Sequence, residues 1–345
     1  MNLYGLSIFS SSSVVVRRLF LLFLAVLLSG CVTASKSYRD DPLIGTIIDS
    51  DDQQTLTFEQ LVERAAVADV VYLAEKHDNA DQHAAQVKII EELVKRGLKP
   101  VIGFEFFDVG ETGLLTQFAL GKPSTMKLKS SVKMPSAEDR LRTKLGWEKQ
   151  DDEYWGYYFR LIELARSHQL DIFGADLPQG IKTRISRGGL EVLNALELSQ
   201  LNPSGYDDPA YQALMYEQFR QGHCGWGQED LLRRLYQTWI ARNDRMAASI
   251  AEMSQESRQG PLVIILGNGH VRHNMGVYER VAFLAPELKQ FNMGFREIAI
   301  DPLPVSEYVA SEIVEGNTFA PIHEVLWFTQ RQDYGDACKG FHKPK

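Results

Sequence analysis

Titratable side chains follow the ends of several apolar runs that have the composition of buried strands. Glu75 and His77 come directly after the run VVYLA, and Glu105 lies inside the run GFEFF. A later run, PLVIILGNGH, ends in His270. Two carboxylates and two imidazoles can hold a divalent metal, or they can act as general acids and bases on a water molecule.

Two of these residues have surroundings that favour a functional role. Glu105 has apolar neighbours, and a buried carboxylate needs a charge partner, a metal or a proton. His270 follows a Gly-Asn-Gly turn whose permissive backbone can bring the imidazole close to a ligand. The chain has no H-E-x-x-H, G-x-S-x-G or G-x-G-x-x-G motif. The residues therefore predict a polar site without identifying its reaction.

The polar residues after His77 have simpler explanations. Asn79, with Gln82 three residues later, fits a helix N-cap with a capping box, so we expect Asp78 and Asn79 to begin a helix. Asp81 in the first turn complements the helix dipole. His83 lies on the apolar face of that helix, where a buried structural histidine and a functional one both remain open.

A second feature is aromatic. The segment DDEYWGYYF places Tyr154, Trp155, Tyr157, Tyr158 and Phe159 around one helix. Because such rings cannot all face the core, some must face a ligand or another segment. An aromatic surface with phenol groups could hold a flat hydrophobic ligand, and haem with a phenolate axial ligand is one example.

Apolar strand-like runs alternate with helical segments, which is typical of βαβ units in a parallel sheet. Ligands of such sheets bind at the carboxyl ends of the strands. We therefore predict an α/β fold with a mainly parallel β-sheet flanked by helices, and a smaller helical insertion domain. The predicted divisions are a signal at 1–30, a tether at 31–42, an α/β domain at 43–110 with 170–180 and 228–335, and helical insertion segments at 111–169 and 181–227.

The N-terminus has the features of a secretory signal. Arg17 and Arg18 precede the apolar run LFLLFLAVLL, which is short for a membrane span, and then SGC. The ending LLSGC resembles the lipobox of bacterial lipoproteins, which implies acylation, for instance with palmitate, at Cys31. An ordinary signal peptide with a chance cysteine is the alternative. Val32 after the cysteine favours sorting to the outer membrane by the same resemblance.

Composition limits the partners. The formal net charge is −8, and removing the signal makes it −10, which argues against nucleic acid and against electrostatic docking to anionic lipid. Beyond Cys31 only Cys224 and Cys338 remain. They could pair in an oxidising compartment, although their spacing does not show that they are neighbours.

Several runs, in chain order between Pro42 and Glu287, resemble the ChaN-like haem-binding lipoproteins. These runs are YLAEKHDNADQHAAQ, GFEFF, WGYYFRLIELA, DIFGADLP, HCG, ARNDRMAASIA and LGNGHVRHNMG. The family belongs to a superfamily with erythromycin esterases, TraB and the Tiki proteases. The resemblance implies a parallel sheet with a smaller helical domain, haem uptake, a tyrosine ligand to haem, dimers that sandwich haem pairs, and an outer-membrane haem receptor as partner.

The resemblance also implies roles for individual residues. The superfamily motif G-E-x-H falls on AEKH, so Ala74 replaces its glycine, and the second motif, G-x-x-H, is intact at Gly267 and His270. In hydrolytic relatives the matching positions bind metal or activate water; here they are Glu75, His77, Glu105 and His270. For haem the candidates are Tyr158 first, because it matches the family's helix, then Tyr157, Tyr154 and His83.

These observations predict a haem-binding lipoprotein of the cell envelope that assists haem and iron uptake. It would be anchored in the outer membrane through Cys31, on the periplasmic or surface face. The alternative is a metal-dependent hydrolase of the esterase or peptidase type that uses the Glu and His residues at the strand ends, and a scaffold lipoprotein is a third reading. Whether the chain is an enzyme stays open at this point.

Overall fold

A computed structural model describes residues 40–121, 135–199, 201, 208–256, 258–333, 335, 338 and 339. The predicted signal and Cys31 lie outside the described residues. No helix in the described part of the chain is long and apolar enough to cross a membrane.

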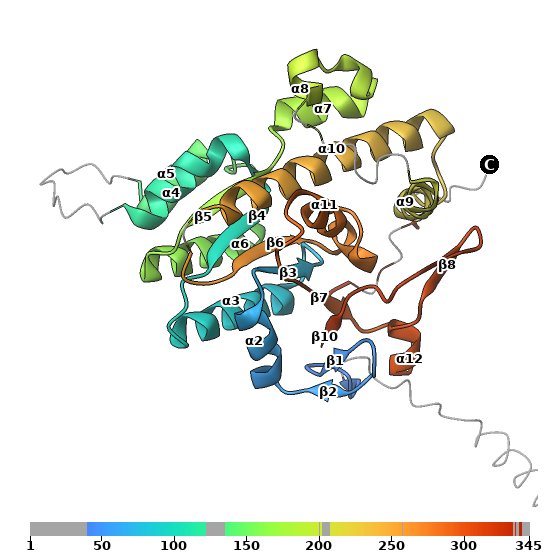
Figure 1. The fold of residues 1–345 in the computed structure, drawn as a ribbon, viewed down its shortest axis with the longest axis horizontal. Coiled ribbons are helices and arrows are strands. Elements are labelled where there is room, and N and C mark those ends of the chain that lie inside the picture. Colours follow the sequence, from blue (N-terminus) through green and yellow to red (C-terminus); the bar gives the residue numbers. More distant parts are fainter. Residues whose placement is uncertain are drawn as a thin grey trace, which may run out of the picture.

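The centre of the fold is an eight-stranded sheet in the order β2-β1-β10-β7-β3-β6-β4-β5 (Figure 1). The six strands from β10 to β5 run parallel, and β1 and β2 add an antiparallel hairpin at one edge. This confirms the predicted mainly parallel sheet. The strands are β1 (Ile47–Asp49), β2 (Thr55–Leu56), β3 (Val70–Glu75), β4 (Val101–Asp108), β5 (Ile172–Asp176), β6 (Leu262–Gly267), β7 (Gln290–Glu297) and β10 (Val325–Thr329). A separate hairpin consists of β8 (Glu312–Val314) and β9 (Asn317–Phe319).

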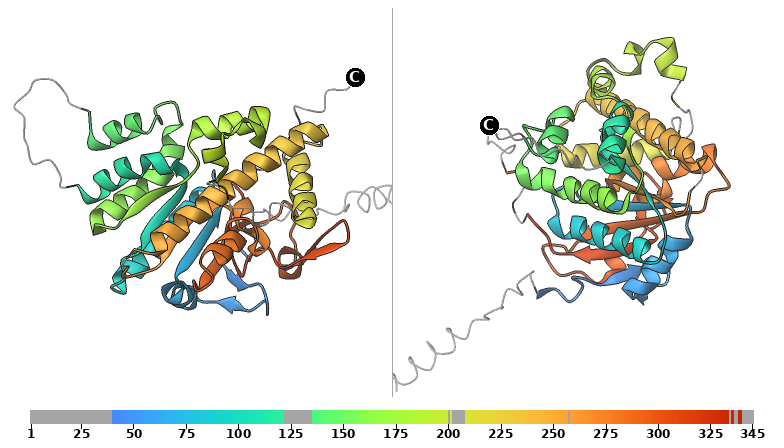
Figure 2. Two further views of the ribbon diagram at one scale, coloured as in Figure 1. Left: turned by 45° about the horizontal axis from the view of Figure 1, so that its top comes forward. Right: turned by 90° about the vertical axis from the view of Figure 1, so that its left-hand side faces the viewer.

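Helices cover both faces of this sheet (Figure 2). Strand β3 shows why: Val71 and Leu73 face one apolar core, while Tyr72 and Ala74 face the other. Helices α2 (Phe58–Val67), α3 (Ala80–Lys95) and α6 (Asp152–His168) pack in the first core, and α10 (Glu229–Ser254) and α11 (Val277–Leu284) pack in the second. Near-continuous apolar strands are the expected result of burial on both faces.

The predicted insertion segments supply most of the remaining helices. Segment 111–169 contains α4 (Thr112–Leu120), α5 (Ala137–Lys144) and α6, which share the core of α3, and α4 and α5 lie side by side beyond β5 (Figure 1). Segment 181–227 contains most of α7 (Gln179–Gly188), together with α8 (Ala195–Ser199) and α9 (Pro209–Gly222), which packs on α10. Short helix α12 (Val305–Tyr308) precedes the β8–β9 hairpin. The domain boundaries themselves stay a prediction.

The start of α3 corrects one detail of the predicted cap. Asn79 is the N-cap and accepts a hydrogen bond from the backbone N–H of Gln82, as predicted. The side chain of Gln82 does not complete a capping box, because its Oε1 accepts from the backbone N–H of Lys76. Asp78 is not the cap either; its carboxylate forms an ion pair with Lys76 at 2.8 Å.

Cys224 and Cys338 are joined by a disulfide bond, with their Cα atoms 5.4 Å apart. The bond ties the turn between α9 and α10 to the chain beyond β10. Disulfides persist in oxidising compartments.

A buried ion pair joins α10 to α11. The Arg280 Nε donates to Asp244 Oδ1 at 2.5 Å, and the residues are 0% and 1% exposed. Such a pair is costly to break, because removal of one partner leaves the other charge buried without compensation.

We therefore expect Asp244→Ala to lower the free energy of unfolding by about 3–5 kcal/mol, measured by chemical denaturation. Glu279→Gln is the control, since Glu279 also contacts Arg280 but its side chain is 27% exposed. Its effect should be below about 1 kcal/mol. Equal effects of the two substitutions would show that the Arg280–Asp244 pair does not stabilise the helix contact.

Candidate functional site

The carboxyl ends of the parallel strands surround one cavity of about 530 Å³. Glu75 at the end of β3 is in register with Gly267 at the end of β6, and Glu105 approaches from β4. All four predicted Glu and His residues line this cavity, together with side chains from α10 and β7. The lining residues are Glu75, Lys76, His77, Glu105, Trp239, Arg242, Gly267, Asn268, Gly269, His270, Phe295, Arg296, Glu297 and Arg331.

Glu105 is a buried carboxylate of the cavity that contacts two cationic or imidazole side chains and one backbone N–H. Its Oε1 lies 2.6 Å from Arg242 and 3.1 Å from Nε2 of His270, and its Oε2 accepts the backbone N–H of Gly267 at 2.6 Å. Burial alone would raise the pKa of Glu105, but its contacts with His270 and with the charged Arg242 outweigh burial and hold this pKa well below its usual range. Glu105 is therefore an ionised carboxylate whose two oxygens are occupied.

His270 is held on its other sides as well. Its Nδ1 lies 2.5 Å from Oδ1 of Asn243, and its ring stacks on Trp239 with centroids 3.8 Å apart. Burial lowers the pKa of His270, although the charge of Glu105 opposes this effect. The ring is thus held on one face by Trp239 and at both of its nitrogens.

Glu75 connects the cavity to the aromatic helix α6. Its Oε1 accepts a hydrogen bond from the hydroxyl of Tyr158 at 2.7 Å and lies 3.2 Å from Nδ1 of His77. Its Oε2 accepts from the amide of Gln86 at 2.5 Å and lies 3.3 Å from Nδ1 of His83. Both oxygens of this buried carboxylate thus have partners within the chain.

His77 is the most accessible of the four predicted residues, with 43% of its side chain exposed. Burial would lower the pKa of His77, but the hydrogen bond to Glu75 and the charge of Glu105 raise it. Phe106 touches the ring edge-on, with centroids 4.7 Å apart.

The first glycine of the GNGH turn matters because it lacks a side chain, not because its backbone angles are unusual. Gly267 has a φ of −67°, which any residue can adopt. A Cβ at Gly267 would lie 2.6 Å from Cε1 of His77, so the absence of a side chain lets this ring approach β6. The expected permissive backbone is not what this glycine provides.

The predicted haem residues occupy different positions. Tyr158 is fully buried, and burial together with the charge of Glu75 raises the pKa of its phenol well above the usual range. Tyr154 and Tyr157 are half-buried. His83 is buried, with Nε2 3.0 Å from the carbonyl oxygen of His77, and it stacks on Tyr157. Only Tyr154 and Tyr157 expose part of their rings.

The donors at the strand ends do not suit a divalent metal. Glu75 and Glu105 use all four oxygens on groups of the chain, and Arg242 adds a positive charge next to Glu105. Within the described ranges, no group of three or more His, Cys, Asp and Glu residues is arranged to hold a metal ion. The predicted metal-dependent hydrolase therefore gains no support from this geometry.

Helix α10 supplies contacts that the sequence analysis did not single out. Trp239, Arg242 and Asn243 lie on one helical face and reach His270 or Glu105. Arg242 also binds Asp176 at the end of β5, at 2.9 Å. The sequence indicates this shared face, because the three residues are spaced i, i+3 and i+4 in the run WIARN.

The contact between His77 and Glu75 predicts a pH dependence. NMR titration of the His77 ring should give a pKa above 6.5. Because the folded-state pKa is raised, the contact stabilises the fold below the unfolded pKa, and this contribution is lost as pH rises through the folded-state value. The effect on stability should be small, since the side chain is partly exposed.

Glu75→Gln tests the cause of this shift. It removes the carboxylate but keeps the shape of the side chain, so the pKa of His77 should move down toward 6.5. An unchanged titration would mean that Glu75 does not set the charge of His77.

Several solved structures are similar to the chain. The chain is similar to a structure of ChaN of Campylobacter jejuni, which is described with cofacial haem binding. The TM-score is 0.57 and the sequence identity is 19%, and the match covers 81% of this chain and 95% of the ChaN chain. It is also similar to a mutant of the erythromycin esterase EreC, with TM-score 0.40, 14% identity, and 74% and 77% coverage. A succinoglycan biosynthesis protein gives TM-score 0.41, 13% identity, and 80% and 91% coverage. No curated protein sequence matches the chain.

The sequence itself identifies the family. Residues 61–281 match the model described as haem-binding uptake, Tiki superfamily, ChaN. This range includes all of the predicted Glu, His and Tyr site residues and most of the parallel sheet. The chain therefore belongs to the ChaN family of haem-binding uptake proteins in the Tiki superfamily.

Proposed function

We propose that this protein binds haem on an aromatic face beside the cavity, formed by Phe106, Trp147, Tyr154 and Tyr157. The single observation that carries the proposal is that Tyr154 and Tyr157, two phenols in the matched segment, are half-buried at this face. Trp147 stacks on Tyr154 with centroids 6.0 Å apart, and Phe106 and Tyr157 each lie 6.4 Å from Tyr154. A porphyrin needs such flat apolar surroundings.

Tyr154 is our first candidate for the iron ligand. Its ring contacts Trp147, Phe106 and Tyr157 of the proposed face. Burial raises the pKa of its phenol, a hydrogen bond with Tyr158 opposes this effect, and the charges of Glu75 and Glu105 add to it. The hydroxyl of Tyr157 instead donates to Glu153 at 2.7 Å, and burial with this contact raises its pKa to about 12. Tyr158 could bind iron only after leaving Glu75 and the core.

Basic side chains of the cavity suit the carboxylates of haem. Lys76, Arg296 and Arg331 line the cavity. Arg296 is exposed and forms no ion pair with any residue that the structure describes. We infer that haem propionates lie toward these residues, because charge-assisted bonds between guanidinium and carboxylate are among the strong ones. Bound haem supplies the iron, and the chain supplies the phenol, the apolar face and the positive charges.

Haem titration followed by the Soret band tests the proposal. We expect Tyr154→Phe to weaken binding at least about tenfold and to change the ligand-to-iron charge-transfer bands, because the phenolate is lost. Tyr157→Phe is the second candidate, and Tyr158→Phe is the matched control that removes a buried phenol. No haem binding by the unaltered protein would refute the proposal, and loss confined to Tyr158→Phe would reassign the ligand.

We further propose that the protein works in haem uptake as a lipoprotein anchored at Cys31 in the cell envelope. The disulfide between Cys224 and Cys338 supports an oxidising compartment. A homodimer around two haems and an outer-membrane haem receptor are the partners that we expect.

Cell fractionation tests this location. The unaltered protein should be found with the outer membrane, and mass spectrometry should find acyl chains on Cys31. Cys31→Ser removes the acceptor thiol, so the protein should be released from the membrane fraction. Cytoplasmic location of the unaltered protein would contradict the proposal.

A further inference from the structure

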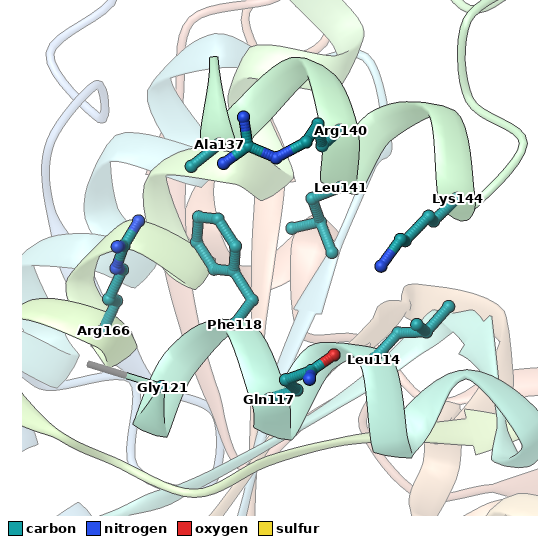
Figure 3. A pocket seen from close by; sticks show the side chains of 9 residues that line it. All are labelled: Leu114, Gln117, Phe118, Gly121, Ala137, Arg140, Leu141, Lys144 and Arg166. Atoms are coloured by element: carbon teal, nitrogen blue, oxygen red, sulfur yellow. The ribbon is translucent and has the colours of Figure 1, made fainter. Parts of the chain in front are cut away.

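A second cavity, of about 200 Å³, lies between α4, α5 and α6 and shares no residue with the cavity at the strand ends (Figure 3). Three basic side chains surround it: Arg140 and Lys144 from α5, and Arg166 from α6. Between them lie the side chains of Phe118 and Leu141 (Figure 3). The family resemblance assigns no role to these residues.

The positive charges of this cavity are not neutralised by neighbours. The lining contains no Asp or Glu, and none of the three basic side chains forms an ion pair within the part of the chain that the structure describes. The net charge of the chain is −8, so the lining of this cavity has the opposite charge to the chain as a whole.

Helix stability explains part of this arrangement. Lys144 and Arg166 lie in the last turns of their helices, where a cation complements the dipole, and Arg140 donates to the carbonyl oxygen of Pro135. However, Arg140 and Lys144 are also four residues apart on one helix, and like charges at this spacing are destabilising. An anion bound between the two side chains would offset their repulsion.

The floor of the cavity is apolar. Leu114, Phe118 and Leu141 line it, and the guanidinium of Arg166 lies over the Phe118 ring, 4.6 Å from its centroid. Gln117 is the only neutral polar side chain of the lining. A ligand would thus meet positive charge at the rim and hydrocarbon below. The volume is less than that of a pocket for a drug-sized molecule, which begins at about 300 Å³, so a porphyrin does not fit.

We propose that this cavity binds a small amphipathic anion, with a phosphate or carboxylate group between Arg140, Lys144 and Arg166 and a short hydrocarbon part against Leu114, Phe118 and Leu141. A soluble alkyl phosphate or carboxylate and the headgroup region of an anionic phospholipid share this chemistry. The site shares no residue with the proposed haem face.

Isothermal titration calorimetry with octyl phosphate, below its micelle concentration, tests the site on the purified full chain. The double variant Arg140→Gln/Lys144→Gln should bind at least about tenfold more weakly, because two charge-assisted contacts are lost. The control Lys149→Gln/Lys289→Gln removes the same charge at exposed lysines outside the cavity and should bind like the unaltered protein. Uncharged octanol should not compete.

Two outcomes would overturn the proposal: no binding of octyl phosphate by the unaltered protein, or equal weakening in the two double variants, which would indicate attraction to net charge alone. Circular dichroism checks that both double variants fold. The variant Phe118→Ala tests the apolar part of the site separately, since it should weaken the binding of octyl phosphate but not that of inorganic phosphate.

Sedimentation with phosphatidylglycerol vesicles distinguishes the sources of the anion. This arm uses a Cys31→Ser background, so that the predicted lipid anchor does not hold the protein on the vesicle. Vesicle binding that depends on Arg140 and Lys144 would identify phospholipid as the ligand. Vesicle binding independent of both residues, or none, with octyl phosphate binding retained, would identify a soluble amphiphile.

Discussion

The guanidinium of Arg242 binds Glu105 and Asp176 at the same time, and this double contact holds together the ends of β4 and β5 with the middle of α10. Lys182 from α7 adds a further contact to Asp176 at 2.7 Å. Without these cations, two carboxylates would be buried near each other at one sheet edge. Loss of hydration and mutual repulsion would then strongly destabilise their charged forms. Arg242 of α10 and Lys182 of α7 thus supply the positive charge that these two buried acids need beside the open cavity.

The strand ends could be located from the sequence because each parallel strand is an apolar run that stops at a polar residue. That reasoning brought Glu75, His77, Glu105 and His270 into one cavity correctly. It could not show the internal pairing of these acids, since Arg242 and Asp176 come from distant segments. It also could not rank the tyrosines of α6: five aromatic residues surround that helix, and only the packing of α3 and β4 decides that Tyr158 is inside while Tyr154 and Tyr157 are half-buried.

The two carboxylates at the strand ends have unequal surroundings. Glu105 contacts a guanidinium, a backbone N–H and an imidazole, whereas Glu75 contacts a phenol, an amide and two imidazoles. The contacts of Glu105 stabilise its negative charge at the ends of the strands. The contacts of Glu75 link the sheet to the helix of the proposed haem face, through the hydroxyl of Tyr158. A change in the position of α6 would therefore alter the partners of Glu75 and His77 directly.

Cys338 follows the last strand of the sheet, while its partner Cys224 lies between α9 and α10, 114 residues earlier. In the folded chain, the bond joins the segment after β10 to the turn before the long helix α10. Because the bond closes a loop across 114 residues of sequence, it lowers the conformational entropy of the unfolded chain and so stabilises the folded one.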